Sequence, residues 1–568
     1  MGKRGLLSYD CQTMSATPIQ SPRAGGDQSS VGSTSRTIVT GAASNELVFA
    51  VVGHVGSGTS EIADALTEIL KETELEHQTF EVEVVKARDI ILAWATAKGL
   101  VPPAHSEPPT LGEVEKLQNL GDDMRGELTL EGRPDYAAVA RGMVGRIREA
   151  RARKTNAKAE DGKPVIPDGR PRAYIVDSIR HPEEVHLLRR IYTDAFVLIG
   201  VVCEEERRCE RVTAKYRDAG KPAALDFMRR DADDKKKHGQ HVSDAFHLSD
   251  FFVDNTPARK VDGRPNPAWD INEHLSRLVK ILTHSMLERP SSAETAMYHA
   301  QGAAMQSACL SRQVGAALID ANGTLLATGS NEVPKAGGGV YGEGAEKEVH
   351  DGRCAYRERD EIKFCRNTRE QNEIINELIS AIPELKAAPP DRKEALAIEL
   401  RNTRIGSLVE FSRAVHAEMD ALLSAARKGV HIAGTRLFVT TFPCHYCARH
   451  IITAGIDELQ YIEPYPKSRA LALHDDAIKI EKLNWIPPSQ NGSQVLFRAF
   501  SGVAPRLYKR AFLKERELKD RNTGDMAPQL PIWGQPWHLG RYSYVELEAA
   551  LTNPAGEIAW KKPVSGSG

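Results

Sequence analysis

The 568-residue chain lacks several features that would place it in a specialised class. It has no run of 18 apolar residues, the minimum for a transmembrane helix, and its first ten residues lack the apolar core of a secretory signal. Lysine and arginine total 75 against 77 aspartate and glutamate residues, so the basic excess of a duplex nucleic-acid binder is absent. We therefore expect a soluble, cytoplasmic protein whose partners include neither a membrane nor duplex nucleic acid.

Aromatic residues and cysteines are also scarce. Aromatic residues make up 6% of the chain, which disfavours a groove that stacks single-stranded bases. Eight cysteines are too few for a disulfide scaffold of this length, and the close pair at positions 444 and 447 indicates metal or redox chemistry in a reducing compartment. The 41% hydrophobic and 27% charged residues are typical of a globular protein with a buried core.

Residue patterns divide the chain into four parts. Residues 1–46 are rich in Ser, Gly and Thr and predict a disordered tail. Apolar runs then alternate with helical patterns, which is typical of a doubly wound α/β sheet over residues 47–289. Its strands are expected at 47–52, 173–179, 195–202 and 251–255. We expect this sheet to end near residue 256 and a helix over 271–289 to lead to the domain boundary.

The third part, residues 290–514, predicts a smaller α/β layer. Two apolar runs around an Asn-Gly turn, at 314–320 and 324–331, indicate a β-hairpin. A charged insertion at about 335–405 is expected to form a helical arm or a subunit contact. The other elements are expected as helices over 293–311, 413–429 and 442–455 and strands over 435–441 and 458–465. The fourth part, residues 515–568, holds three of the six tryptophans. We expect it to pack either on a neighbouring subunit or over its own subunit.

A glycine-rich segment follows the first predicted strand and precedes a helical pattern. It has the shape G-x-x-x-x-G-[K]-[ST], in which backbone N–H groups and a helix N-terminus cradle phosphate. The candidate nucleotide-binding residues are Gly53, Gly56, Ser57, Gly58, Thr59 and Ser60. Ser60 is the candidate magnesium ligand, and Asp177 is the candidate acid that supports it without ligating the ion directly. Thr59 replaces the expected lysine, so we favour binding of a regulatory nucleotide, with an active kinase and a structural relic as alternatives. Arginines at 207–211 and 229–230 are candidate lid charges, and residues 47–256 resemble nucleotide kinases.

The strongest motif joins His416-Ala417-Glu418 to Pro443-Cys444-His445-Tyr446-Cys447. H-x-E followed by P-C-x-x-C is the signature of zinc nucleobase deaminases. His416, Cys444 and Cys447 supply three zinc ligands, and the open fourth position marks a catalytic rather than a structural site. Glu418 is the candidate catalytic acid and base, which transfers protons while activated water attacks C4 of cytosine. A redox pair and half of a structural zinc site are the alternatives for the two cysteines.

At these residues the chain resembles the CMP/dCMP-type deaminases over roughly 290–510, which implies a cytidine-deaminase-like three-layer α/β/α fold. The resemblance carries sugar binding over to Asn331. Tyr465 and Lys467 are candidate contacts to base or phosphate. His350, Cys354 and Cys365 lie in the insertion, as ordinary loop residues or as ligands of a second zinc.

A phosphate-loop domain ahead of such a deaminase resembles the bacterial anti-phage dCTP deaminases. The resemblance implies conversion of dCTP, and of dCMP as a further substrate, to deoxyuridine nucleotides during infection. It implies Zn²⁺, a regulatory nucleotide with Mg²⁺, and a homo-oligomer, and it leaves open a regulatory RNA or a phage-derived trigger. A single-stranded DNA or RNA deaminase and a nucleotide kinase or sensor with a secondary deaminase activity are the alternatives.

Overall fold

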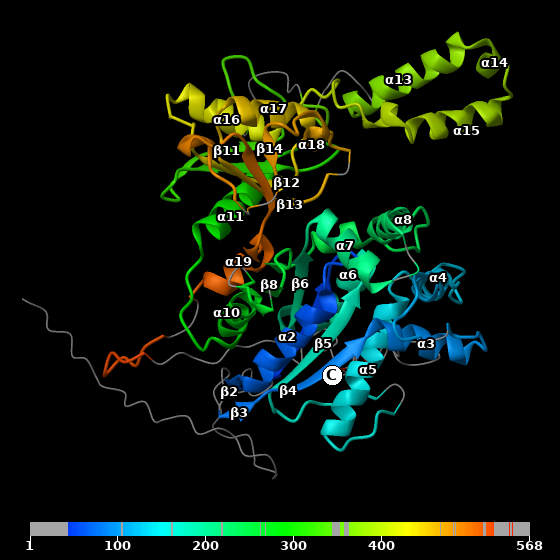
Figure 1. The fold of residues 1–568 in the computed structure, drawn as a ribbon, viewed down its shortest axis with the longest axis vertical. Helices are drawn as coiled ribbons and strands as arrows, with labels where there is room; N and C mark the ends of the chain where they lie inside the picture. Colours follow the sequence, from blue (N-terminus) through cyan, green and yellow to red (C-terminus); the bar gives the residue numbers. More distant parts are fainter. Residues whose placement is uncertain are drawn as a thin grey trace, which may run out of the picture.

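A computed structural model describes residues 44–526, Val545 and Glu548 of the chain (Figure 1). Internal gaps in this range are residues 76, 104–105, 161–162, 217, 219, 262, 267–268, 343–352, 357–362, 466, 481, 483 and 515–517. Most of the predicted N-terminal tail and of the C-terminal extension therefore lies outside the described residues. Within the described part, no helix is long and apolar enough to cross a membrane.

The first region is built on a six-stranded sheet with the order β16-β7-β6-β1-β5-β4. Its strands are β1 (Glu46–Val52), β4 (Glu81–Lys86), β5 (Arg172–Ile179), β6 (Phe196–Val202), β7 (Phe251–Asp254) and β16 (Gly502–Val503). All but β16 run parallel. Every residue of β1 is buried, as a central parallel strand requires. Strand β1 begins at Glu46, inside the stretch predicted as a tail. Strand β4 was not predicted, because its sequence EVEVVK interrupts the apolar run with charges.

Helices connect these strands and cover the sheet (Figure 1). They are α2 (Thr59–Glu72), α3 (Ala87–Ala97), α4 (Leu111–Gly126), α5 (Ala138–Lys154), α6 (Pro182–Tyr192), α7 (Glu205–Lys215), α8 (Lys221–Ala232), α9 (Val242–Phe246) and α10 (Ile271–Thr283), with the 3₁₀ turn Thr193–Ala195. Two short hairpins add β2 (Glu74–Leu75), β3 (Gln78–Thr79), β8 (Lys260–Val261) and β9 (Arg264–Pro265). The helix predicted over 271–289 ends at Thr283, because His284 adopts the left-handed conformation with φ 57°.

The second region holds a six-stranded sheet with the order β11-β10-β12-β13-β15-β14. Its strands are β10 (Gly315–Ile319), β11 (Leu325–Ser330), β12 (Arg436–Thr441), β13 (Glu458–Glu463), β14 (Ile478–Lys479) and β15 (Val495–Ala499). The hairpin β10–β11 is antiparallel, which confirms the predicted Asn-Gly turn. Strands β12, β13, β15 and β14 run parallel to one another. Strands β14 and β15 were not predicted.

Helices of the second region lie against this sheet, except for an arm that projects from it (Figure 1). The packed helices are α11 (Ser292–Ala304), α16 (Ala417–Arg427), α17 (His445–Thr453) and α18 (Ala470–Leu473). Helix α19 (Pro505–Phe512) lies between the two regions instead. The arm comprises α13 (Arg366–Ala381), α14 (Pro383–Lys386) and α15 (Pro390–Arg401), and 3₁₀ turns lie at Arg404–Ser407 and Pro488–Gln490. The predicted helices over 293–311 and 413–429 are therefore shorter than expected. Helix α16 starts after His416, whose backbone is extended.

The two regions share one core. Strand β16, from the end of the second region, pairs antiparallel with β7 of the first sheet. The expectation that this sheet ends near residue 256 is therefore wrong. The rings of Phe252 and Phe500 meet edge to face with centroids 6.2 Å apart, and α19 packs against α10 and α11. Buried Glu548 forms an ion pair with Arg151 of α5, so this part of the C-terminal extension packs on its own chain.

Candidate active site

Three side chains with metal-ligating atoms converge where two helices of the second region begin. His416 is the N-cap of α16, Cys444 is the N-cap of α17, and Cys447 lies in the first turn of α17. His416 Nδ1 lies 3.2 Å from Cys444 Sγ and 3.4 Å from Cys447 Sγ. Their ligand atoms all lie within 4.8 Å of one another, and both cysteines are buried. The structure therefore brings together all three predicted metal ligands.

Local sequence explains this convergence. Strand β12 ends at Thr441, and the following Phe-Pro keeps the chain extended up to the N-cap Cys444, so Pro443 precedes the helix rather than forming its first turn. On the other side, Gly329 of β11 lies against α16. A Cβ at Gly329 would collide with the backbone of Ala417 and Ala421. Glycine at this position lets the start of α16 lie directly on the hairpin.

The donor set fits zinc. One imidazole nitrogen and two thiol sulfurs are the ligand types that Zn²⁺ prefers, at about 2.0–2.1 Å for nitrogen and 2.3 Å for sulfur. Donor separations of 3.2 and 3.4 Å are close to those of ligands sharing one ion. The pKa of the Cys444 thiol is lowered because Cys447 and His416 hydrogen-bond to its sulfur. When bound, zinc with three protein ligands activates a water molecule as a nucleophile.

Glu418 lies beside the ligands but is not one of the three clustered side chains. Its side chain is 3% exposed, and this burial raises its pKa to about 7. A hydrogen bond from Cys447 further orients the carboxyl group. A buried carboxyl group with a pKa near neutrality is suited to accept a proton from water and pass it on.

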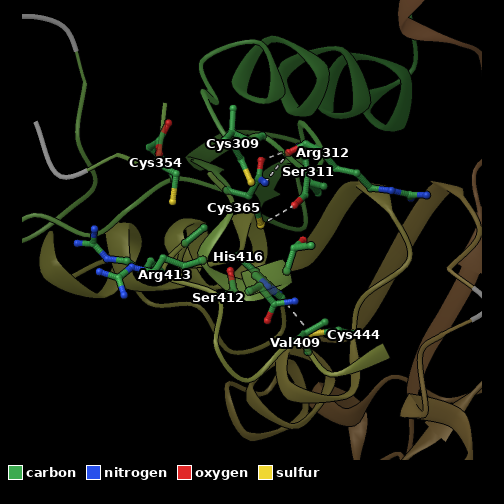
Figure 2. A pocket seen from close by; sticks show the side chains of 18 of the residues that line it. Cys309, Ser311, Arg312, Cys354, Cys365, Val409, Ser412, Arg413, His416 and Cys444 are labelled. Atoms are coloured by element: carbon green, nitrogen blue, oxygen red, sulfur yellow. Dashed lines mark hydrogen bonds between the residues drawn. The ribbon is translucent and has the colours of Figure 1, made fainter. Parts of the chain in front are cut away.

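A cavity of about 370 Å³ opens onto the His416 and Cys444 side chains (Figure 2). Its walls include His416, Glu418 and Cys444. They also include the three predicted substrate contacts, Asn331, Tyr465 and Lys467. The structure therefore places every predicted substrate-binding residue at the same cavity.

The Asn331 side chain also holds the cavity wall in place. Its Nδ2 donates to the Arg312 carbonyl and its Oδ1 accepts from the Val314 N–H, both at 2.7 Å. An asparagine amide has two donor hydrogens and two acceptor lone pairs, so one of each stays available to a ligand.

Three arginines also line the cavity: Arg312, Arg366 and Arg413. Arg312 and Arg413 are labelled in Figure 2. Sequence reasoning missed them as site residues. Arg366 belongs to the segment predicted as a charged arm, and the base of that arm closes one wall of the cavity. Arg312 pairs with Glu463 at 2.7 Å. Single arginines carry no spacing pattern, so only the folded chain identifies them.

The cysteines of the insertion also reach this cavity. Cys354 and Cys365 line it with Cys309 (Figure 2). They do not form a second ligand cluster within the described part of the chain. His350, the third residue of the predicted second zinc site, lies outside the described residues.

The predicted glycine-rich segment forms a turn between β1 and α2 in the first region. Gly58 is the N-cap of α2 with φ 86°, a left-handed conformation that favours glycine. Asn255 fixes the turn by donating to the Ser57 carbonyl at 2.8 Å. Ser60 Oγ donates to Asp177 Oδ2 at 2.8 Å, so the predicted magnesium ligand lies beside its predicted supporting acid.

Comparison with known proteins identifies the family. The model of the cytidine and deoxycytidylate deaminase zinc-binding region matches residues 290–463. Deoxycytidylate deaminase of Enterobacteria phage T4 is 31% identical over 182 residues, which cover 31% of this chain and 80% of the phage protein. The chain belongs to the cytidine and deoxycytidylate deaminase family. It is a zinc-binding hydrolytic deaminase, and the matched segment contains Glu418 and all three clustered ligands.

Two other proteins are similar to this deaminase over 34% and 38% of the chain. Deoxycytidylate deaminase of Enterobacteria phage T2 is 29% identical over 201 residues, which cover 34% of this chain and 94% of that protein. The crystal structure of dCMP deaminase from the cyanophage S-TIM5 aligns with 38% of this chain and all of its own, at 18% identity and a TM-score of 0.20.

Proposed function

We propose that the deaminase converts deoxycytidine nucleotides, dCTP and also dCMP, to deoxyuridine nucleotides and ammonia. The convergence of His416, Cys444 and Cys447 beside buried Glu418, inside a cavity lined by cations, is the observation that carries this proposal. The two phage relatives, both named deoxycytidylate deaminases, support the choice of base and sugar.

Each side chain has a stated task in this proposal. His416, Cys444 and Cys447 hold zinc. Glu418 accepts one proton from water at its carboxylate and delivers it to N3 of the cytosine ring. It then takes the second proton of that water from the new C4 hydroxyl and passes it to the departing amine, which leaves as ammonia. Asn331 donates its second amide hydrogen to the sugar, and Tyr465, half-buried in the cavity wall, contacts the base.

Cations at the cavity account for a phosphorylated substrate. Four cationic side chains line the cavity: Arg312, Arg366, Arg413 and Lys467. Arg312 is already paired with Glu463. Arg366 has no ion-pair partner in the described part of the chain, and its Nε is buried without a hydrogen bond. Lys467 makes only a long hydrogen bond of 3.4 Å to the Gly406 carbonyl. Guanidinium and ammonium groups bind phosphate oxygens strongly, so we assign Arg366 and Lys467 to the phosphates.

We also propose that the turn after β1 binds a regulatory nucleotide. Gly53, Gly56, Ser57, Gly58, Thr59 and Ser60 form its phosphate cradle. The strand–turn–helix setting and the contact of Ser60 with Asp177, where Mg²⁺ would bind, support this role. The resemblance to anti-phage dCTP deaminases adds the biological context: the reaction depletes a DNA precursor during phage infection.

Substrate profiling of the purified full-length protein tests the catalytic proposal. The assay offers dCTP, dCMP, cytidine and a cytosine-containing oligonucleotide in parallel, and ammonia release and bound zinc are measured. We expect turnover of dCTP and dCMP, with at least one zinc per chain. Turnover of the oligonucleotide alone would instead make the protein a polynucleotide deaminase.

A second experiment tests regulation and defence. Deamination of dCTP is measured with and without ATP or dTTP for the wild type and Ser60→Ala, and the wild type is expected to respond more strongly. In infected cells, the wild type but not Glu418→Gln should lower the dCTP pool and phage yield. An effector response that is identical in both proteins would remove the regulatory role.

A further inference from the structure

Helix α7 of the first region packs directly on the glycine-rich turn. A Cβ at Gly56 would lie 2.7 Å from the backbone oxygen of Arg208 and 3.0 Å from its Cα. One helical turn later, Arg211 Nη1 lies 3.6 Å from the position of a Cβ at Gly58. The same guanidinium donates to the Ser57 carbonyl at 3.4 Å and to the Asn255 carbonyl at 2.9 Å. Two arginines spaced by three residues therefore flank a turn that is far away in the sequence.

Neither Arg208 nor Arg211 forms an ion pair with a carboxylate of the described residues, although neighbouring arginines do. Arg207 pairs with Glu210 at 2.7 Å, and Arg180 pairs with Asp231 at 2.8 Å. The side chains of Arg208 and Arg211 donate to carbonyl groups, and Arg211 also lies near the Cys203 sulfur. Both are half-buried, and burial lowers the pKa of Arg208. A partly desolvated charge without a counter-ion is unfavourable, and a bound anion would remove this cost.

The turn itself presents unused hydrogen-bond donors. No described residue accepts a hydrogen bond from the backbone N–H of Gly56, Gly58, Thr59 or Ser60. The Ser57 hydroxyl is also unpartnered, although Ser57 is only 1% exposed. A Cβ added at Gly53 would collide with this hydroxyl, so the hydroxyl faces the inside of the turn. Such convergent N–H groups bind anions.

We propose that Arg211, supported by Arg208, supplies the positive charge that Thr59 does not, so that α7 and the turn together bind the polyphosphate of a nucleotide. This inference rests on the proposed nucleotide binding at the turn and names the residues that make it possible without a turn lysine. The Arg211 guanidinium lies beside the N-cap Gly58, where the unused N–H groups of Thr59 and Ser60 begin the helix. The ligand is recognised by its phosphates, so inorganic tripolyphosphate should compete for the same site.

Isothermal titration calorimetry on the zinc-loaded full-length protein tests this inference with Mg²⁺-ATP as the probe. The wild type is expected to bind ATP, and tripolyphosphate to compete. Arg211→Ala should weaken ATP binding by about ten-fold or more, as expected for loss of a charge-assisted hydrogen bond. Arg211→Lys should recover part of this loss. Arg207→Ala is the matched control on the same helix and should bind within two-fold of the wild type.

Basal deamination of dCTP without ATP and the circular dichroism spectrum report whether each variant folds. If Arg211→Ala does not fold, Arg211→Gln keeps the aliphatic stem and a polar end without the charge, and serves as the test. Wild-type affinity in a folded Arg211 variant would overturn this inference and leave nucleotide binding at the turn intact. Absence of ATP binding to the wild type would overturn both.

Discussion

The metal centre and the glycine-rich turn both use the N-terminus of a helix, but in different ways. At the metal centre, the N-cap residues themselves are ligands, His416 for α16 and Cys444 for α17. At the turn, the N-cap of α2 is Gly58, which offers only backbone. Side chains with free lone pairs at a helix start can ligate a cation. A glycine cap has no side chain and exposes backbone N–H groups that bind an anion. In these two sites, the cap residue determines whether side-chain atoms or backbone N–H groups face the ligand, and therefore whether the ligand is a cation or an anion.

The two sites also differ in completeness. The three clustered side chains and Glu418 all lie at the starts of α16 and α17, so this site is built within the second region. The turn has the shape of a phosphate cradle but lacks its lysine, and it depends on α7 for positive charge. The first site should therefore respond to single substitutions with complete loss, and the second with graded changes.

Removal of the metal should give the largest effect. Dialysis against a zinc chelator is expected to abolish deamination of dCTP, and added Zn²⁺ should restore it, because the clustered side chains of His416, Cys444 and Cys447 would hold the ion without covalent attachment. Metal analysis and ammonia release are measured together. ATP binding at the turn should survive the treatment, and its loss would show that the two sites are not separate structures.

Substitution Glu418→Gln should reduce turnover by about 10²–10⁴-fold, the usual contribution of a general acid and base. The amide keeps the size of the side chain but cannot accept and deliver a proton. Zinc content should stay at the wild-type level, because Glu418 is not part of the clustered ligand set. Steady-state kinetics and metal analysis of the same sample check this. Near-normal turnover would contradict the assigned role.

Substitution Glu548→Ala should destabilise the first region by about 3–5 kcal/mol, the usual cost of removing one partner from a buried ion pair. Arg151 Nη2 lies 3.1 Å from Glu548 and its Nε 2.8 Å from Glu46, so the substitution removes one of the carboxylates paired with this guanidinium. Urea unfolding measures the free energy. The control Glu149→Ala removes an exposed pair with Arg146 and should cost about 1 kcal/mol or less.

Glu548 also illustrates why part of the fold was not predictable from sequence. Strands β1, β5, β6 and β7 were predicted because each is a continuous apolar run. Strand β16 has two residues and joins the first sheet from position 502, a pairing that no local pattern reveals. The same holds for the ion pair of Arg151 with Glu548, 397 residues away.

Predictability of the sites follows the same rule. The three clustered side chains of the candidate metal site were all singled out from sequence, because the chemistry fixes the residue types and their spacing. At the turn, the glycines were predicted from spacing, and arginines at 207–211 were expected only as lid charges. The proximity of Arg211 to Gly58 depends on the packing of α7. Arg366 was missed as a site residue, because its role depends on where the arm joins the cavity.

Substitution Arg366→Ala tests the contribution of the arm and should have an intermediate effect. We expect the KM for dCTP to rise by about ten-fold or more, since a guanidinium–phosphate contact is lost, while kcat changes little. The KM for cytidine should not change, because cytidine has no phosphate. Arg369→Ala is the control: Arg369 lies on the same helix, stacks on Phe364 and does not line the cavity. Equal effects on dCTP and cytidine would assign Arg366 a structural role.

The smallest effect is expected at Tyr461 of β13, where the two regions meet. Its ring contacts Phe442 edge to face with centroids 4.8 Å apart, and Phe442 lines the cavity. Burial, with the negative charges of Glu204 and Asp254, raises the pKa of Tyr461 to about 12. Glu204 precedes α7, so Tyr461 lies within electrostatic range of the start of that helix and packs on the Phe442 ring of the active-site wall.

Substitution Tyr461→Phe keeps the ring contact and removes the hydroxyl group. Basal deamination should change by less than about two-fold, because the hydroxyl is not part of the cavity wall. The ratio of rates with and without ATP should move toward one if α7 transmits nucleotide binding through this contact. Tyr298→Phe is the control, since Tyr298 stacks on Tyr508 away from the cavity. An unchanged ratio in Tyr461→Phe would mean that coupling between the regions, where present, runs through the shared β7–β16 pairing instead.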